Sequence, residues 1–337
     1  MNDILPWWTA HWDSLRERRR EGRFPHALLL TGAGGLGKGR FAQMLAQALL
    51  CDSPTVSGRG CGACVGCTLF AAGSHPDALK VVPAEEGKAI VVDQIRSLCA
   101  DLSLSSHAGG FKVAVLVPAD RMNAAAANSL LKTLEEPSDN TVLVLVSERP
   151  AALPATVRSR CQQIRLAVPA RDMAQEWLTA QLATPEQAAL LLDLAAGAPL
   201  LALELARTDV ITRRHERFAE LTALFEGRTE VLTAAAEWAQ DKNIESLQWF
   251  TAWVMDMIRL KSGPQPAGLR NSDLRDGLMA LAERVDSKDL HALLDQLWTA
   301  RRLAATSVNR QLLFEDVLIG WAQMGAARHG RQRQVRP

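Results

Sequence analysis

Residues 28–39 read LLLTGAGGLGKG, and this stretch decides the fold because an apolar run leads directly into a glycine-rich loop that ends on a lysine. The apolar run predicts a buried strand at 26–31, and the pattern after Lys38 predicts a helix. The glycines allow a tight loop whose N–H groups face phosphate oxygens, and the N-terminus of the helix adds partial positive charge. The stretch therefore predicts a phosphate-binding P-loop in which the residues that contact phosphate are Gly32, Gly34, Gly37 and Lys38.

Two parts that ATP hydrolysis requires are missing from the sequence. The last position of the motif is normally a Ser or Thr that binds Mg²⁺, and here it is Gly39. The strand expected at 112–117 should end on carboxylates, but Val117 and Pro118 stand there. Asp120 lies beyond the end of the strand and is interpreted as a surface charge or a helix cap. Because both missing parts stabilise charge during phosphoryl transfer, we expect weak ATP binding at most and no independent hydrolysis.

The first half of the chain alternates β-rich apolar runs with helical patterns, which is typical of βαβ units around a parallel sheet. From Val168 onward the strand signals vanish, and apolar residues recur with a period near 3.6, as from Ile244 to Ile258. The predicted fold class is therefore α/β followed by all-α. The expected strands are 26–31, 79–82, 112–117, 141–147 and 162–166, and the expected helices between them are 38–50, 93–103 and 123–136.

These changes of pattern predict three domains. They are an α/β domain at 1–166 with a cysteine-rich insert at 51–67, a small helical domain at 167–207 and a larger helical domain at 208–337. Within the last domain, the stretch KSGPQPAG at 261–268 predicts a loop. The basic tail at 328–337 has no periodicity, and we expect a frayed, solvated end there.

Bulk composition excludes several classes of function. The 337 residues include 38 basic and 37 acidic side chains, so a net charge of +1 would not hold the chain on nucleic acid or on an anionic membrane by itself. The N-terminus lacks a basic region followed by an apolar core, and the most apolar stretch, 188–206, is interrupted by Asp193 and Glu204. We therefore expect a cytoplasmic protein with no signal peptide and no membrane span.

Four of the six cysteines are crowded into one segment with the spacing C-x9-C-x2-C-x2-C. Gaps of two residues let successive thiolates converge on one tetrahedral ion, and the interspersed glycines permit the tight turns. An iron–sulfur cluster and metal-free thiols are the alternatives, but the x3-C-P continuation that follows such a run in ferredoxins is absent. The spacing favours a structural zinc site with the ligands Cys51, Cys61, Cys64 and Cys67.

The sequence holds two further cysteines and a histidine near the insert. Cys99 and Cys161 are interpreted as ordinary buried thiols. His75, which is followed by Pro76, is interpreted as a loop residue rather than a fifth ligand.

An arginine pair lies between the fourth and fifth expected strands. The stretch ATVRSRC at 155–161 contains Arg158 and Arg160. On composition alone these arginines are a solvated pair, a DNA contact or a finger aimed at the nucleotide of a neighbouring subunit, and the three alternatives stay open.

Several long motifs together resemble the bacterial clamp-loader AAA+ family. They cover the whole first domain, and two later stretches are similar to the lid and collar helices of that family. Within the family the decayed phosphate motifs with a retained Ser-Arg-Cys resemble the delta-prime kind rather than the gamma/tau motor kind. The motifs are FPHALLLTGAGGLGK at 24–38, the cysteine insert, GGFKVAVLVPADRMNAAAANSLLKTLEEP at 109–137, ATVRSRCQ at 155–162, GAPLLALELA at 197–206 and NRQLLFEDVLIGW at 309–321.

The resemblance implies roles for single residues. Arg160 would be a finger acting in trans, Ser147 would occupy the sensor 1 position, and the usual sensor 2 arginine is replaced in Leu200–Leu201. The chain would act as a stator in a hetero-oligomeric ring with gamma/tau and delta subunits, and the ring would load a sliding clamp onto primed DNA.

The sequence leaves two alternative functions open. The first is an active ATPase motor subunit of the same ring, since Lys38 is retained. The second is a nucleic-acid-binding zinc module, although residues 61–67 contain no Lys, Arg or aromatic side chain.

The expected helix at 123–136 ends on two acids, Glu135 and Glu136, where the helix dipole disfavours negative charge. Such a local conflict indicates a packing or interface role. An ordinary salt bridge from these acids to Lys132 is the alternative.

Overall fold

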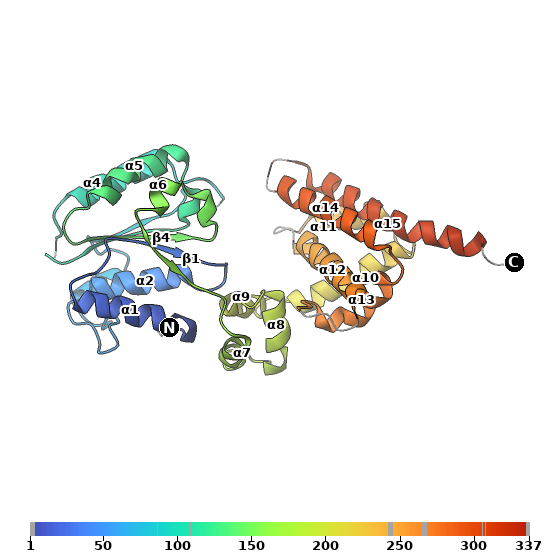
Figure 1. Cartoon of the computed structure of the whole chain (residues 1–337), viewed down its shortest axis with the longest axis horizontal. Helices are drawn as coiled ribbons and strands as arrows, with labels where there is room; N and C mark the ends of the chain where they lie inside the picture. Colours follow the sequence, from blue (N-terminus) through green and yellow to red (C-terminus); the bar gives the residue numbers. More distant parts are fainter. Residues whose placement is uncertain are drawn as a thin grey trace. The chain divides into compact units, whose positions relative to one another are not determined.

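A five-stranded parallel sheet with helices on both faces occupies the first half of the chain in the computed structural model (Figure 1). The structure describes residues 4–85, 87–107, 109–241, 245–263, 268–304, 306 and 308–334. The strands are β1 Ala27–Thr31, β2 Ala78–Val81, β3 Lys112–Leu116, β4 Thr141–Ser147 and β5 Gln162–Arg165.

The sheet order is β2-β3-β4-β1-β5, and every neighbouring pair of strands is parallel. Strand β1 therefore lies between β4 and β5, with Thr31 paired to Ser147 on one side and to Arg165 on the other. Because parallel strands end at the same edge, the loops after β1, β3 and β4 gather at one edge of the sheet. The phosphate loop follows β1 at this edge.

The helices of the α/β region cover the two faces of the sheet. Helices α1 Thr9–Arg20 and α2 Lys38–Leu49 lie on one face, and α4 Val92–Ser103 and α5 Ala124–Glu135 lie on the other (Figure 1). Alternate residues of each central strand, such as Leu29 and Leu143, enter a buried cluster with Ile95, Leu98, Leu130 and Leu134 of the α4 and α5 face. Burial on both faces explains why these strands are continuous apolar runs.

Beyond β5 the described part of the chain contains helices and connecting segments but no strand, so the predicted order of α/β followed by all-α is confirmed. The shorter elements of the first half are η1 Pro6–Trp8, α3 Val65–Ala71, η2 Ala119–Arg121, η3 Pro150–Ala152 and α6 Ala155–Arg158. The second half consists of α7 Arg171–Thr179, η4 Pro185–Gln187, α8 Ala188–Leu194, α9 Pro199–Leu205, α10 Val210–Phe225, α11 Val231–Ala239, α12 Glu245–Ser262, η5 Ser272–Leu274, α13 Arg275–Ala282, α14 Ser287–Leu303 and α15 Arg310–Gln334.

The chain forms two compact units, 1–176 with 198–201, and 177–197 with 202–337. The second unit has its own core, in which aromatic residues such as Trp238, Trp253 and Trp321 are fully buried. The three-domain division of the sequence stays a prediction.

The bounds of the five strands and of α2, α4 and α5 agree with the sequence patterns to within one residue. Strand β3 ends at Leu116, one residue earlier than expected, and the tail expected to fray belongs to α15 as far as Gln334. Of the loop expected at 261–268, Lys261 and Ser262 end α12 instead, and 264–267 lie outside the described residues, as does Ile244.

Over the described residues no single helix is long and apolar enough to cross a membrane, while one bent pair, Pro185–Leu194 with Pro199–Leu205, reaches that length and composition together.

Candidate functional site

The predicted phosphate loop lies where the sequence places it, between the end of β1 and the first turn of α2. Lys38 opens α2, and its side chain is only 4% exposed. Its Nζ donates to the carbonyl oxygen of Ala33 at 2.5 Å and lies 3.3 Å from Oε1 of Glu148. The lysine that would meet a terminal phosphate is thus bound to a carboxylate and a carbonyl of its own chain.

Apolar and aromatic residues from distant segments cover the same loop. The indole nitrogens of Trp7 and Trp8 donate to the carbonyl oxygen of Leu36 at 3.1 and 3.0 Å. A Cβ on Gly37 would lie 2.4 Å from the ring of Trp8. The loop is therefore closed on this side by the N-terminal segment.

Leu200 and Leu201 close the loop at a second point. The backbone N–H of Leu200 donates to the carbonyl oxygen of Gly35 at 3.1 Å, and a Cβ on Gly35 would lie 2.4 Å from the Cβ of Leu201. Gly35 has a φ of +71°, which glycine adopts without strain. These two leucines, where the sequence resemblance notes a missing sensor 2 arginine, contact the loop directly.

Asp120 has a different role from the one predicted. Its side chain is 4% exposed, and its carboxylate accepts hydrogen bonds from the backbone N–H of Glu148 at 3.3 Å and from Nε of Arg149 at 3.2 Å. The interpretation as a surface charge or helix cap was wrong, because the polar groups that follow β4 are close enough to satisfy a buried carboxylate. Asp120 holds the segment that carries Glu148 toward Lys38.

The positions that normally bind Mg²⁺ carry no side chain that could do so. Gly39 lies in the first turn of α2, and a Cβ there would meet nothing within 4 Å. Val117 and Pro118 follow the end of β3. Ser147 is fully buried at the end of β4, and its Oγ accepts from the backbone N–H of Arg149 at 3.1 Å. The hydroxyl and carboxylates that would hold Mg²⁺ are absent from these positions.

The four predicted cysteine ligands converge. The Sγ atoms of Cys51, Cys61, Cys64 and Cys67 all lie within 4.8 Å of one another, and those of Cys51 and Cys64 are 3.8 Å apart. A tetrahedral Zn²⁺ with Zn–S bonds of about 2.3 Å would place sulfurs about 3.8 Å apart. The group can therefore hold one metal ion. His75 is not part of it, because its Nδ1 accepts from the backbone N–H of Asp77 at 3.1 Å.

Backbone N–H groups and burial set the pKa values of these thiols in opposite directions. The N–H groups of Ala63 and Cys64 lower the pKa of Cys61 to about 6. Burial raises the pKa of Cys67 to about 12 and also raises that of Cys51. Since a metal binds thiolates, a cation at the centre would offset the cost of ionising the two buried thiols, and the residues present fit such an ion.

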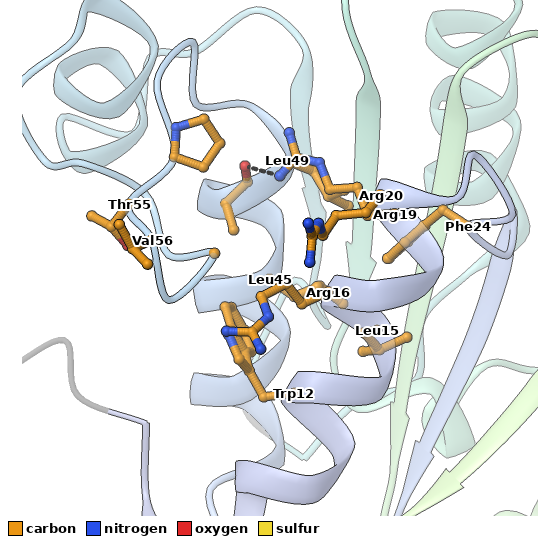
Figure 2. Close-up of a pocket in the computed structure, with 13 residues that line it drawn as sticks. Trp12, Leu15, Arg16, Arg19, Arg20, Phe24, Leu45, Leu49, Thr55 and Val56 are labelled. Carbon is orange, nitrogen blue, oxygen red and sulfur yellow. Dashed lines mark hydrogen bonds between the residues drawn. The ribbon is translucent and has the colours of Figure 1, made fainter.

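The insert that carries the cysteines is attached to α1. Nε1 of Trp12 donates to the carbonyl oxygen of Ser57 at 2.9 Å. Beside this contact lies a pocket of about 640 Å³ between α1, α2 and the insert, in which Arg19 donates to the carbonyl oxygen of Ala48 at 2.6 Å (Figure 2). The pocket and the cysteines are near the C-terminal end of α2, whereas Lys38 begins that helix.

Arg160 lies in the turn between α6 and β5, and its side chain is 36% exposed. Nη1 donates to the carbonyl oxygen of Thr156 at 3.0 Å, and Nη2 lies 2.5 Å from Oε1 of Glu135. Cys161, the next residue, is buried, and burial raises the pKa of its thiol to about 11, so it is an inert core thiol as predicted. Cys99 is only half-buried and accepts a hydrogen bond from the hydroxyl of Thr133.

The structure does not bring Arg160 and Lys38 together. In the pairing of β1 with β5, Leu28 lies beside Gln162 and Thr31 beside Arg165. Arg160 precedes β5 and the phosphate loop follows β1, so the two features lie at opposite edges of the sheet. The three residue steps between these levels alone span about 10 Å.

Sequence reasoning did not identify Trp8, Leu201 and Glu148 as parts of the phosphate loop, nor Glu135 as the partner of Arg160. Their contacts join residues from 25 to 166 positions apart, as in the 110-residue separation of Lys38 and Glu148. For Glu135 the sequence signal was the pair of acids at the end of α5, which conflicts with the helix dipole, and for Leu201 it was the missing sensor 2 arginine at 200–201.

Known proteins resemble this chain over most of its length. Residues 8–170 match the family model described as "DNA polymerase III, delta subunit", and residues 208–323 match "DNA polymerase III, delta subunit, C terminal". A DNA polymerase III subunit delta' from Pseudomonas aeruginosa is 36% identical over 96% of this chain and 99% of its own length. The subunit delta' from Escherichia coli is 32% identical over 93% of this chain and 94% of its own length.

Another relative matches a shorter part of the chain. The DNA polymerase III subunit tau of Escherichia coli is 33% identical over 43% of this chain and 22% of its own length. The identity over nearly the full length of the delta' relatives is the decisive finding. The chain belongs to the DNA polymerase III delta' subunit family, and its structure has the parallel α/β sheet, the helical second half and the cysteine insert that its sequence predicts.

Proposed function

We propose that this chain is a stator and arginine-finger donor in a clamp loader, in which gamma/tau and delta subunits complete a hetero-oligomeric ring. The ring uses ATP to load a sliding clamp onto primed DNA in the cytoplasm. The chain itself hydrolyses no ATP. The finger is Arg160, and it acts on the nucleotide of an adjacent subunit.

The observation that carries this proposal is the placement of Arg160. Its guanidinium is exposed at one edge of the sheet, while Lys38 of the chain's own phosphate loop is buried at the other edge. An arginine at that edge is too far from Lys38 to serve the same loop, but it is accessible to a neighbouring subunit. A guanidinium there would stabilise charge on the transferred phosphoryl oxygens.

The motor alternative is disfavoured by the same geometry. Lys38 is retained, but it is bound to Ala33 and Glu148. Gly39 and Val117 supply no ligand for Mg²⁺. We infer that any ATP in this loop is bound weakly and is not hydrolysed.

The test is a ring reconstituted with Arg160→Ala, measured for clamp loading and for DNA- and clamp-stimulated ATP turnover. Fingers acting in trans contribute about 10³–10⁵ in turnover in well-studied GTPases, so the site at this interface should become inactive. Arg158→Ala is the matched control and should have a smaller effect. Equal loading rates for wild type and Arg160→Ala, with assembly verified, would reject the finger.

The cysteine group is proposed to bind one structural Zn²⁺. Four protein thiolates fill a tetrahedral ion and leave no position for substrate, so Cys51, Cys61, Cys64 and Cys67 would stabilise the insert rather than take part in catalysis. Metal analysis of protein kept reduced should give one zinc per chain, and Cys64→Ala should lose it. Iron with a visible charge-transfer band, or no metal, would contradict this assignment.

A further inference from the structure

The contact between Glu135 and Arg160 joins two separate elements. Glu135 is the last residue of α5, and Arg160 follows α6. One guanidinium nitrogen of Arg160 meets Glu135 at 2.5 Å, and the other donates to the carbonyl oxygen of Thr156 at 3.0 Å. The planar group is thus held at two points, which fixes both its position and its orientation.

Both sides of this contact are anchored in the core. Leu130 and Leu134 of α5 are buried in the cluster on the α4 and α5 face of the sheet, and Val157 of α6 and Cys161 are buried in the same cluster. The acid and the arginine therefore extend from elements that packing already holds in place. A rigid support of this kind can hold a side chain within the narrow tolerance that catalysis requires.

The contact leaves the arginine able to bind a further group. A guanidinium has five N–H donors, and Glu135 and Thr156 engage two of its nitrogens with one bond each. The side chain of Arg160 is 36% exposed. Since N–H donors remain and the guanidinium is accessible, Arg160 can bind a further group while it stays in contact with Glu135.

The position of Glu135 also explains the conflict noted in the sequence. A carboxylate at the C-terminal end of a helix faces the negative end of the dipole, so it is unfavourable where it stands. The partner is Arg160 rather than Lys132, the alternative that the sequence leaves open. Glu135 therefore stands where the helix dipole disfavours it, and its carboxylate contacts Arg160.

We propose that Glu135 is a positioning residue that holds the guanidinium of Arg160 in the orientation in which it meets a neighbouring subunit's nucleotide. This proposal rests on the finger role proposed above for Arg160. Glu135 touches no substrate; it acts through the arginine.

The test uses an assembled ring in which the only hydrolysing site is the one facing Arg160. Glu135→Ala should lower single-turnover ATP hydrolysis there by about 10- to 100-fold, since small misplacements of a catalytic group have effects of that order. Glu135→Gln retains an oxygen acceptor and should recover most of the rate. Glu136→Ala, which changes the neighbouring exposed acid, should leave the rate unchanged.

A double variant separates positioning from a general structural effect. In the Arg160→Ala background, Glu135→Ala should cause no further loss, because it would act only through the arginine. Additional loss in that background would overturn the proposal. Melting temperatures of the full chain should differ little, since Glu135 is 50% exposed and surface ion pairs contribute little to stability.

Other results would reject either the positioning role of Glu135 or the finger role of Arg160. A wild-type rate in Glu135→Ala, with Arg160→Ala inactive, would overturn positioning and leave the finger standing. Faster hydrolysis in both Glu135→Ala and Glu135→Gln would mean that the acid sequesters the arginine, which also overturns the proposal. A wild-type rate in Arg160→Ala would instead reject the finger itself and, with it, this inference.

Discussion

Two cation–glutamate pairs stand at opposite edges of the same sheet, and they differ mainly in burial. Lys38 is bound to Glu148 and is 4% exposed, whereas Arg160 is bound to Glu135 and is 36% exposed. Trp8 and Leu201 contact the loop around Lys38. A retained cation of the ATPase motif is therefore not sufficient for phosphate binding, because the residues around it determine whether a phosphate can reach it.

Glu148 and Glu135 also contact their partners, Lys38 and Arg160, in different ways. Glu148 approaches Lys38 across the mouth of the phosphate loop, where its oxygens lie 3.2 and 3.4 Å from a Cβ placed on Gly34. A carboxylate there occupies space near the loop that a phosphate would approach. Glu135 instead contacts one side of a guanidinium that retains other donors.

The largest expected effect is at the exposed pair. Arg160→Lys keeps a positive charge beside Glu135, but an ammonium cannot reproduce the planar fork. We expect turnover at this interface to fall at least about 100-fold, approaching the loss for a missing finger. Single-turnover hydrolysis in the reconstituted ring measures it. A rate within a few-fold of wild type would show that charge alone suffices and would weaken the distinction between the two pairs.

A smaller effect, on stability, is expected at the covered loop. Gly35→Ala would place a Cβ 2.4 Å from the Cβ of Leu201 at a φ of +71°, so the free energy of unfolding should fall by about 2 kcal/mol. The control is Gly39→Ala, where a Cβ meets nothing within 4 Å and helix propensity favours alanine by up to about 1 kcal/mol. Urea unfolding of the two variants measures the difference. Equal stabilities would mean that Leu201 does not cover the loop.

The smallest effect is expected when the acid over the loop is removed. Glu148 is 57% exposed, so its pair with Lys38 contributes about 1 kcal/mol at most, and Glu148→Ala should strengthen binding of a fluorescent ATP analogue by no more than about fivefold. The double variant Lys38→Ala/Glu148→Ala should lose that gain. Weaker binding in Glu148→Ala than in wild type would show that Glu148 helps to hold nucleotide.

Local sequence predicted much of this fold and less of the site. The run from Leu28 to Gly39 predicted a strand, loop and helix because a motif of neighbouring residues determines its own backbone. The cysteines were also predicted, since close spacing makes the thiols converge. The role of Asp120 was not, because its partners Glu148 and Arg149 come from another connection of the sheet.

The relation between the two cations could be predicted only in part. Whether Lys38 is covered depends on Trp8 and Leu201, which reach it from both ends of the first unit. The predicted parallel sheet already places Arg160 and the phosphate loop at opposite edges, but the sequence does not show that β5 pairs directly with β1 or in which register. These contacts and pairings depend on tertiary packing, which cannot be predicted from local sequence patterns.

The most direct test of this division of roles is single-turnover ATP hydrolysis in rings reconstituted with wild-type, Lys38→Ala or Arg160→Ala chains, each with assembly verified. We expect the Lys38→Ala ring to hydrolyse the same amount of ATP at the same rate as the wild-type ring. We expect the Arg160→Ala ring to lose the amplitude of one site, the site on the neighbouring subunit. A loss of amplitude in Lys38→Ala together with an unchanged Arg160→Ala ring would contradict the account and make this chain a motor.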